Sequence, residues 1–163
     1  MARFLLVSHW HLDAPIEPVW EALHAVERWP QWWRYVLAVQ ELQQGDAAGV
    51  GALHRYTWTS RLPYQLTFEM RTTLIERPSR LQGLASGELT GEGRWSLQPQ
   101  GSTTVVRYEW QVATTKVWMN LLSPLLAPAF AWNHGQVMAA GGRGLAALLG
   151  VRLLALRPPA QLG

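Results

Sequence analysis

The clearest pattern in the chain is an alternation of apolar and polar positions in "LPYQLTFEMRTTL", residues 62–74. Aromatic and apolar side chains such as Tyr64, Phe68 and Met70 fall on even positions, whereas Glu69 falls on an odd one. A period of two residues predicts a β-strand with one inward and one outward face. The same alternation recurs in "LHRYTWT", "GRWSL" and "TVVRYEWQV". It places a further aromatic set on inward faces: Tyr56, Trp58, Trp95, Tyr108 and Trp110.

The pattern along the rest of the chain predicts helices at both ends of this strand series. Residues 3–12 are strand-like, "DAPIEPVWEALHAV" has helical spacing, and the tryptophan-rich "WPQWW" allows one or two helical turns. Between residues 35 and 115 we expect six strands, joined by connections that are too short for parallel crossovers. Residues 116–156 return to a helical pattern, with Pro124 and Pro128 expected to kink or interrupt its early part. The glycines farther along this helix indicate a close approach of the helix to the sheet.

This order of elements predicts an α+β fold. We expect a seven-stranded, curved antiparallel sheet wrapped around a long C-terminal helix, with two short helices after the first strand. The helix is the one long element able to cover the buried face of the sheet. A gap between a curved sheet and a single helix is then the candidate site. We expect one domain over residues 1–157 and a disordered tail over residues 158–163.

The composition indicates an interior rich in aromatic residues and a surface with few charged residues. Of the 163 residues, 48% are hydrophobic and only 15% are charged, and ten are tryptophan. Apolar surface in excess of a solid core suggests a cavity or an interface. The net charge of +3 comes from scattered arginines rather than from a basic stripe, which argues against binding of nucleic acid.

The absence of several features narrows the function further. The chain contains no cysteine, so it has neither disulfides nor thiolate chemistry. The N-terminus does not resemble a signal peptide, and no apolar stretch is long enough to span a membrane. We therefore expect a cytoplasmic protein without a transmembrane segment.

Catalytic and metal-binding motifs are also missing. His9 and His11 share a strand face opposite the apolar one, and no third ligand appears at a recognisable spacing. Alternation points Glu69 and Glu109 outward, toward cross-strand arginines. We expect no metal and no cofactor, and we assign no catalytic residue. His134 on the C-terminal helix is the one weak candidate for a general base, and the alternative is a partly exposed histidine with a local hydrogen bond.

The segment "ERWPQWWRYV" carries Trp29, Trp32 and Trp33 within five residues. One short turn offers too little surface to bury three indoles. We expect at least one of them to pack in the core and another to line or close the mouth of the cavity.

The motifs "LDAPIEPVWEAL", "WPQWW" and "WNHGQVMAAGGRGLAALLG", in this order around a strand series, resemble the SRPBCC superfamily. This superfamily includes polyketide cyclase/dehydrase-like proteins, START-type lipid carriers and the birch-pollen allergen group. The resemblance covers roughly residues 4–150 and implies the helix-grip fold. It does not specify the function, because the fold hosts carriers, cyclases and hydrolases.

Three hypotheses follow. The first is a binding module that holds a lipid, quinone or aromatic polyketide-like molecule between the sheet and the C-terminal helix. The second is a polyketide cyclase or dehydratase that acts in the same cavity. The third is an interaction protein that docks through the apolar "LLALRPP" segment, and a weak homodimer is left open. For the cavity we predict twelve ligand-binding residues: Trp33, Tyr56, Trp58, Tyr64, Phe68, Met70, Trp95, Tyr108, Trp110, Trp118, Asn133 and His134.

Overall fold

The computed structural model describes residues 3–161. Its elements in chain order are β1 (Arg3–Leu12), α1 (Ile16–His24), the 3₁₀ turn η1 (Val26–Arg28), α2 (Trp29–Trp32), β2 (Val36–Gln43), β3 (Leu53–Trp58), β4 (Leu66–Glu76), β5 (Arg80–Gly87), β6 (Leu89–Gln100), β7 (Thr103–Thr114), α3 (Val117–Leu149) and β8 (Leu153–Gln161).

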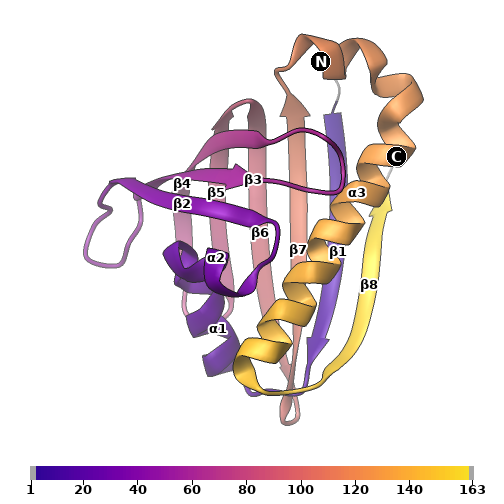
Figure 1. Ribbon diagram of the computed structural model, residues 1–163. Coiled ribbons are helices and arrows are strands. Elements are labelled where there is room, and N and C mark those ends of the chain that lie inside the picture. The colour runs from indigo at the N-terminus through magenta and orange to yellow at the C-terminus, as the bar shows by residue number, and fades with distance from the viewer. Residues whose placement is uncertain (1–2, 162–163) are drawn as a thin grey trace.

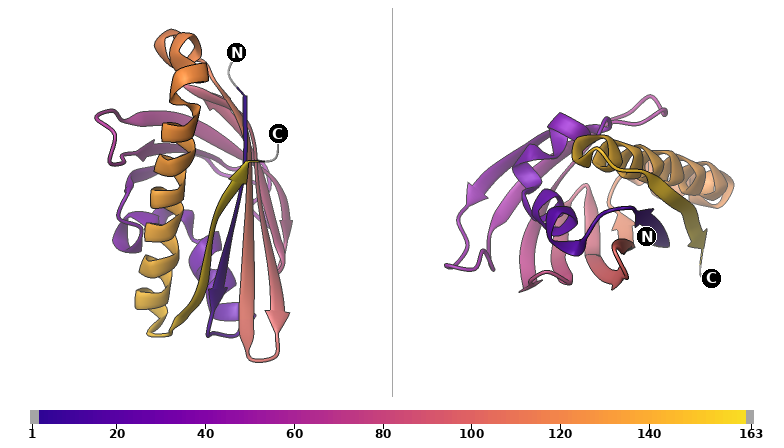
Figure 2. Two further views of the ribbon diagram at one scale, coloured as in Figure 1. Left: turned by 90° about the vertical axis from the view of Figure 1, so that its right-hand side faces the viewer. Right: turned by 90° about the horizontal axis from the view of Figure 1, so that it is seen from below.

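The strands form one antiparallel sheet in the order β2-β3-β4-β5-β6-β7-β1-β8. Consecutive strands from β2 to β7 are neighbours, and β1 joins the far side of β7. The sheet is curved, and α3 crosses its concave side while α1 and α2 lie at one end (Figure 1; Figure 2). This arrangement confirms the helix-grip fold predicted from the order of the elements.

The number of strands is a correction. The sequence predicts seven, with the long helix reaching residue 156 and a disordered tail from residue 158. The helix instead ends at Leu149, Gly150 takes a left-handed conformation, and the chain returns as β8 beside β1. Residues 158–161 therefore belong to a strand, and 162–163 lie outside the described residues. The "LLALRPP" segment is paired in the sheet, so it is not a free docking segment.

Helix α3 continues through both prolines. It bends in its early part and its first turns extend beyond the end of the sheet (Figure 1). Proline removes one backbone donor and pushes on the preceding turn, which bends a helix without necessarily ending it. The prolines therefore kink the helix, one of the two expected outcomes, and do not interrupt it.

All three indoles of the tryptophan segment are buried: Trp29 is 5% exposed, Trp32 9% and Trp33 1%. The expectation that one short turn cannot bury them is wrong, because α3 closes over the segment. A Cβ at Gly141 would overlap the Trp33 ring, and one at Gly144 would collide with the carbonyl oxygen of Trp32. The glycines therefore let the helix backbone reach the tryptophans, an approach to α2 rather than to the sheet alone.

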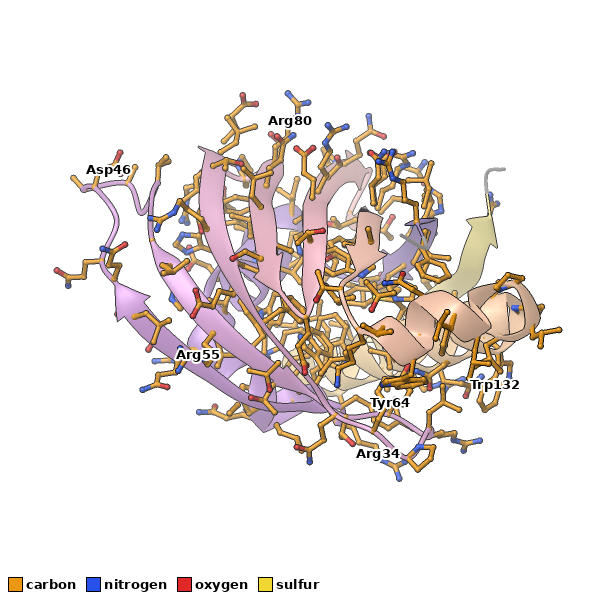
Figure 3. All side chains as sticks on the ribbon, turned by 90° about the horizontal axis from the view of Figure 1, so that it is seen from above. Arg34, Asp46, Arg55, Tyr64, Arg80 and Trp132 are labelled. Carbon is orange, nitrogen blue, oxygen red and sulfur yellow. The ribbon has the colours of Figure 1, made fainter. Side chains whose placement is uncertain are left out.

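The convex face of the sheet carries the ion pairs of the two outward glutamates. Glu69 has the expected cross-strand partner, with Arg55 Nη2 3.0 Å from Glu69 Oε1. Glu109 lies closest to an arginine of its own strand, with Arg107 Nη2 at 3.0 Å, and the cross-strand Arg94 is 4.0 Å away. Figure 3 shows Arg55 and Arg80 projecting away from the interior. Among the described residues, no helix is both long and apolar enough to cross a membrane.

Candidate functional site

A cavity of about 890 Å³ lies between the concave face of the sheet and α3. The inward faces of β3, β4, β6 and β7 supply most of its aromatic wall, and α3 supplies Asn133, His134 and Met138. The tryptophan segment contributes Trp29 and Trp33 at one end. This volume is within the range of pockets that take drug-sized ligands.

Eleven of the twelve residues predicted from the sequence line this cavity, which leaves Trp118 as the exception. Trp118 lies at the second position of α3, where the helix extends past the sheet, and it is 42% exposed. Its ring contacts Tyr64 edge-on, at 5.5 Å between centroids. The expectation that Trp118 lines the cavity is therefore wrong, because its side chain lies on the exposed side of the first turn of α3, whereas the neighbouring Met119 is buried and lines the cavity.

The aromatic rings of the wall pack on one another. Tyr108 stacks on Trp95 with centroids 4.1 Å apart, and Tyr56 stacks on Phe68 at 6.0 Å. Trp33 meets Trp58 edge-on at 5.0 Å. Rings held on both sides have few alternative rotamers, so the wall keeps its shape with or without a ligand.

Two glycines keep the floor of the cavity open. Gly83 on β5 and Gly93 on β6 are directly paired across the ladder, and both line the cavity. A Cβ at Gly93 would lie 2.8 Å from Tyr108 Oη and 3.1 Å from the Trp110 ring. A side chain there would displace both aromatic rings, so the missing Cβ is what leaves room for the Tyr108 hydroxyl.

Two polar atoms of α3 on its cavity side, one from Asn133 and one from His134, have no hydrogen-bond partner among the described residues. Asn133 is 8% exposed. Its Oδ1 atom and His134 Nε2 are enclosed without a hydrogen bond to any residue described in the range 3–161. Burial lowers the pKa of His134 to about 4, so this imidazole is neutral at neutral pH. The histidine is half-buried and faces the cavity, whereas the alternative from the sequence was a partly exposed residue with a local hydrogen bond.

The charged groups of the lining gather around η1, β2 and the loop that follows β2. Glu27 and Glu41 lie beside His54, and Glu27 Oε1 is 3.5 Å from His54 Nε2. One ligand atom from each of these three residues lies within 4.8 Å of the others. Sequence analysis missed this group because its members are fourteen and thirteen positions apart on three different elements. The inward position of His54 in the alternation was the only available signal.

His9 and His11 lie on the opposite face from Trp10, as alternation predicts. His11 Nε2 is 2.7 Å from Thr103 Oγ1, a contact with the neighbouring strand. Desolvation, followed by the charges of Arg107 and Arg157, lowers the pKa of His9. Two cations beside His9 make this face unfavourable for a metal ion.

Solved structures with the same fold are numerous. A protein of Thermus thermophilus is 16% identical with a TM-score of 0.72, over 88% of this chain and 98% of that one. A START superfamily protein of Mycobacterium smegmatis is 15% identical with a TM-score of 0.71, over 90% and 99%. The di-domain ARO/CYC StfQ from the steffimycin biosynthetic pathway is 12% identical with a TM-score of 0.65, over 91% of this chain and 52% of that one.

A comparison with curated protein sequences gave no significant match. At these identities the structural likenesses establish the fold alone. The family model described as "Polyketide cyclase / dehydrase and lipid transport" matches residues 5–150, which is most of the chain. The cavity between sheet and helix agrees with this match. The chain therefore belongs to the polyketide cyclase/dehydrase and lipid transport family.

Proposed function

We propose that the protein binds a hydrophobic small molecule (a lipid, a quinone or an aromatic polyketide-like compound) in the cavity, and holds or carries it without changing it. The observation that supports this most directly is the aromatic cavity of about 890 Å³ itself. An apolar ligand would gain roughly 25 cal/mol per Å² of apolar surface removed from water. The wall is already packed, so little of this gain is lost in ordering side chains.

The position of the acid–base groups favours a carrier over an enzyme, because the close carboxylate–histidine pair among the described lining residues, Glu27 with His54, has an exposed carboxylate. Among the described residues that line the cavity, the carboxylates are Glu27, Glu41 and Asp46, and all belong to η1, β2 or the loop after β2. The aromatic interior offers phenols and the neutral His134 instead. These groups can form hydrogen bonds to a ligand, but a phenol whose raised pKa keeps it protonated at neutral pH cannot act as a general base.

The direct test is to purify the protein and identify bound compounds by native mass spectrometry. A parallel titration with aromatic polyketides, quinones, sterols and fatty acids would follow tryptophan emission, because Trp33, Trp58, Trp95 and Trp110 line the cavity. We expect at least one class to change the emission and to raise the melting temperature. If no compound co-purifies and no class produces either change, the proposal is wrong.

A second candidate function is a cyclase or dehydratase reaction in the same cavity. It is favoured by His134, whose lowered pKa keeps a free base available at neutral pH beside the apolar space. Incubating the protein with a bound polyketide and analysing it by mass spectrometry separates the two functions. Recovery of the unchanged compound supports the carrier. A product that the His134→Gln variant fails to form supports the enzyme.

A further inference from the structure

Three described tyrosines line the cavity, and two of them, Tyr56 and Tyr108, are stacked on other rings of its wall and have hydroxyls without a hydrogen-bond partner among residues 3–161. Tyr56 on β3 is 6% exposed and Tyr108 on β7 is half-buried, and both line the cavity. Within residues 3–161, neither phenol oxygen has a hydrogen bond, and neither is among the fully enclosed polar atoms. A hydroxyl that opens only into an apolar cavity needs a partner there, from water or from a ligand. Such a pair facing an apolar cavity indicates that the ligand supplies the partner.

Both hydroxyls are held in place. Tyr108 is stacked on Trp95 at 4.1 Å and on Trp110 at 5.9 Å, and the missing side chain at Gly93 leaves space for its oxygen. Tyr56 stacks on Phe68. Fixed donors require little reorganisation when a ligand oxygen arrives.

The protonation of these groups makes them donors. Burial raises the pKa of both phenols, and the charge of Glu27 raises that of Tyr56 further. Tyr56 also contributes to the raised pKa of Tyr108. Both therefore keep their protons at neutral pH and can donate to an acceptor.

The charges around the cavity disfavour a negatively charged acceptor. Arg28 is the only arginine or lysine among the described lining residues, and it is exposed. Three carboxylates, Glu27, Glu41 and Asp46, share the lining with it. A ligand carboxylate held deep in the cavity would lose its hydration without gaining a cation. An uncharged carbonyl oxygen can accept a hydrogen bond from either phenol at a much lower cost of desolvation.

We propose that Tyr56 and Tyr108 form a donor pair that selects apolar ligands bearing an uncharged carbonyl oxygen, such as quinones and polycyclic ketones, over carboxylate-bearing lipids. This selectivity rests on the proposed function, because it assumes that the cavity binds a hydrophobic small molecule. It narrows the ligand from three classes to those with a ketone or quinone group.

Three probes of similar size test the proposal: 2-methyl-1,4-naphthoquinone, 2-methylnaphthalene and 2-naphthoic acid. Their dissociation constants are measured at pH 7 by isothermal titration calorimetry. The absence of cysteine prevents covalent addition of the quinone to a thiol. Tyr56→Phe and Tyr108→Phe each remove one unpartnered oxygen, so both variants are expected to fold at least as stably as the wild type.

We expect each Tyr→Phe variant to bind the quinone about fivefold more weakly than the wild type, the equivalent of about 1 kcal/mol per hydrogen bond. The dissociation constant of the hydrocarbon should stay within about twofold of the wild-type value, because the hydrocarbon accepts no hydrogen bond. The matched control is Tyr35→Phe, which alters a buried tyrosine outside the cavity and should change neither constant. The naphthoate should bind at least about tenfold more weakly than the quinone.

The outcomes separate the two proposals. If the hydrocarbon binds but the quinone affinity is unchanged in both variants, the donor pair is wrong and the binding function stands. Tighter binding of the naphthoate than of the quinone also overturns the selectivity. If none of the three probes binds to the wild type, the selectivity is wrong, and the wider panel of polyketides, quinones, sterols and fatty acids decides the binding function.

Discussion

At the scale of single residues, the glycines of α3 decide how closely the helix approaches the tryptophan segment. Trp33 Nε1 donates a 2.8 Å hydrogen bond to the carbonyl oxygen of Val137, one turn before Gly141. This bond and the ring packing require the helix backbone to touch the indoles. Four glycines in one helix are costly for helix propensity, but here two of them bring the helix against Trp32 and Trp33.

Gly144→Ala should therefore destabilise the protein despite the better helix propensity of alanine. The gain of about 1 kcal/mol from propensity is opposed by a Cβ that collides with the Trp32 carbonyl oxygen. A backbone atom cannot turn aside as a side chain can, so we expect a net loss of about 2 kcal/mol. Urea unfolding measures it, with Leu148→Ala, a change at a 53% exposed position, as the control. Stability equal to wild type would contradict the close approach.

His134 makes a prediction about pH. Its folded-state pKa of about 4 lies below its ordinary value of 6.5, so the unfolded chain binds the extra proton first as the pH falls. Stability is therefore complete above pH 6.5 and declines between pH 6.5 and 4. The loss attributable to this group at pH 5 is roughly 2 kcal/mol.

Comparison with His134→Gln isolates this contribution. The free energy of unfolding is measured with urea at pH 7.5 and at pH 5. Its decrease between the two pH values should be smaller in the variant than in the wild type by roughly 2 kcal/mol. His24→Gln, at an exposed position, should retain the wild-type difference. Identical pH dependence of His134→Gln and wild type would place the histidine in a solvated environment.

At the scale of elements, β8 changes the edge of the sheet. It pairs with β1 from Leu12↔Leu153 to Leu6↔Gln161, and Leu156 packs against the core. Without β8, the hydrogen-bonding edge of β1 would be unpaired and the Leu156 contact with the Trp10 region would be lost. The strand therefore protects an edge that is otherwise open to association with another chain.

Deleting residues 154–163 should lower the free energy of unfolding by at least about 2 kcal/mol, the value of burying one leucine. Deleting only residues 162–163 is the control and should have little effect. If the longer deletion is as stable as the shorter one, the pairing of β8 with β1 contributes nothing to stability and this prediction is wrong. Equilibrium urea unfolding measures the difference.

At the scale of the whole molecule, the strands of the sheet separate an apolar cavity on one face from a charged, solvent-facing surface on the other. On β7, Trp110 faces the cavity and Arg107 faces solvent beside Glu109. A ligand that binds only the folded state stabilises it by RT ln(1 + [L]/Kd). The two residues thus provide a paired test of where the ligand lies.

We expect a bound ligand at a hundredfold excess over its Kd to stabilise the wild type by about 2.7 kcal/mol. Arg107→Ala should retain this increment, whereas Trp110→Ala should lose most of it, because only Trp110 contributes to the wall. Thermal unfolding with and without ligand measures both. Equal losses in the two variants would place the ligand outside the cavity.

The sequence by itself determined the faces of the strands and the order of the elements. The alternation in residues 62–74 and 104–112 assigned inward aromatics correctly because a strand has a strict period of two residues. Phe68, Tyr108 and Trp110 line the cavity as this period requires. Short connections between strands excluded parallel pairing for the same local reason.

The tertiary structure alone decided which groups from distant segments meet. The burial of three neighbouring tryptophans depended on α3, more than 100 residues later in the chain, and the sheet position of residues 153–161 depended on pairing with β1. Glu27, Glu41 and His54 come together only because the β2–β3 pairing lies beside η1. Local patterns record the period of each element, whereas these contacts arise from how the elements pack, and packing depends on the shape of every neighbouring surface.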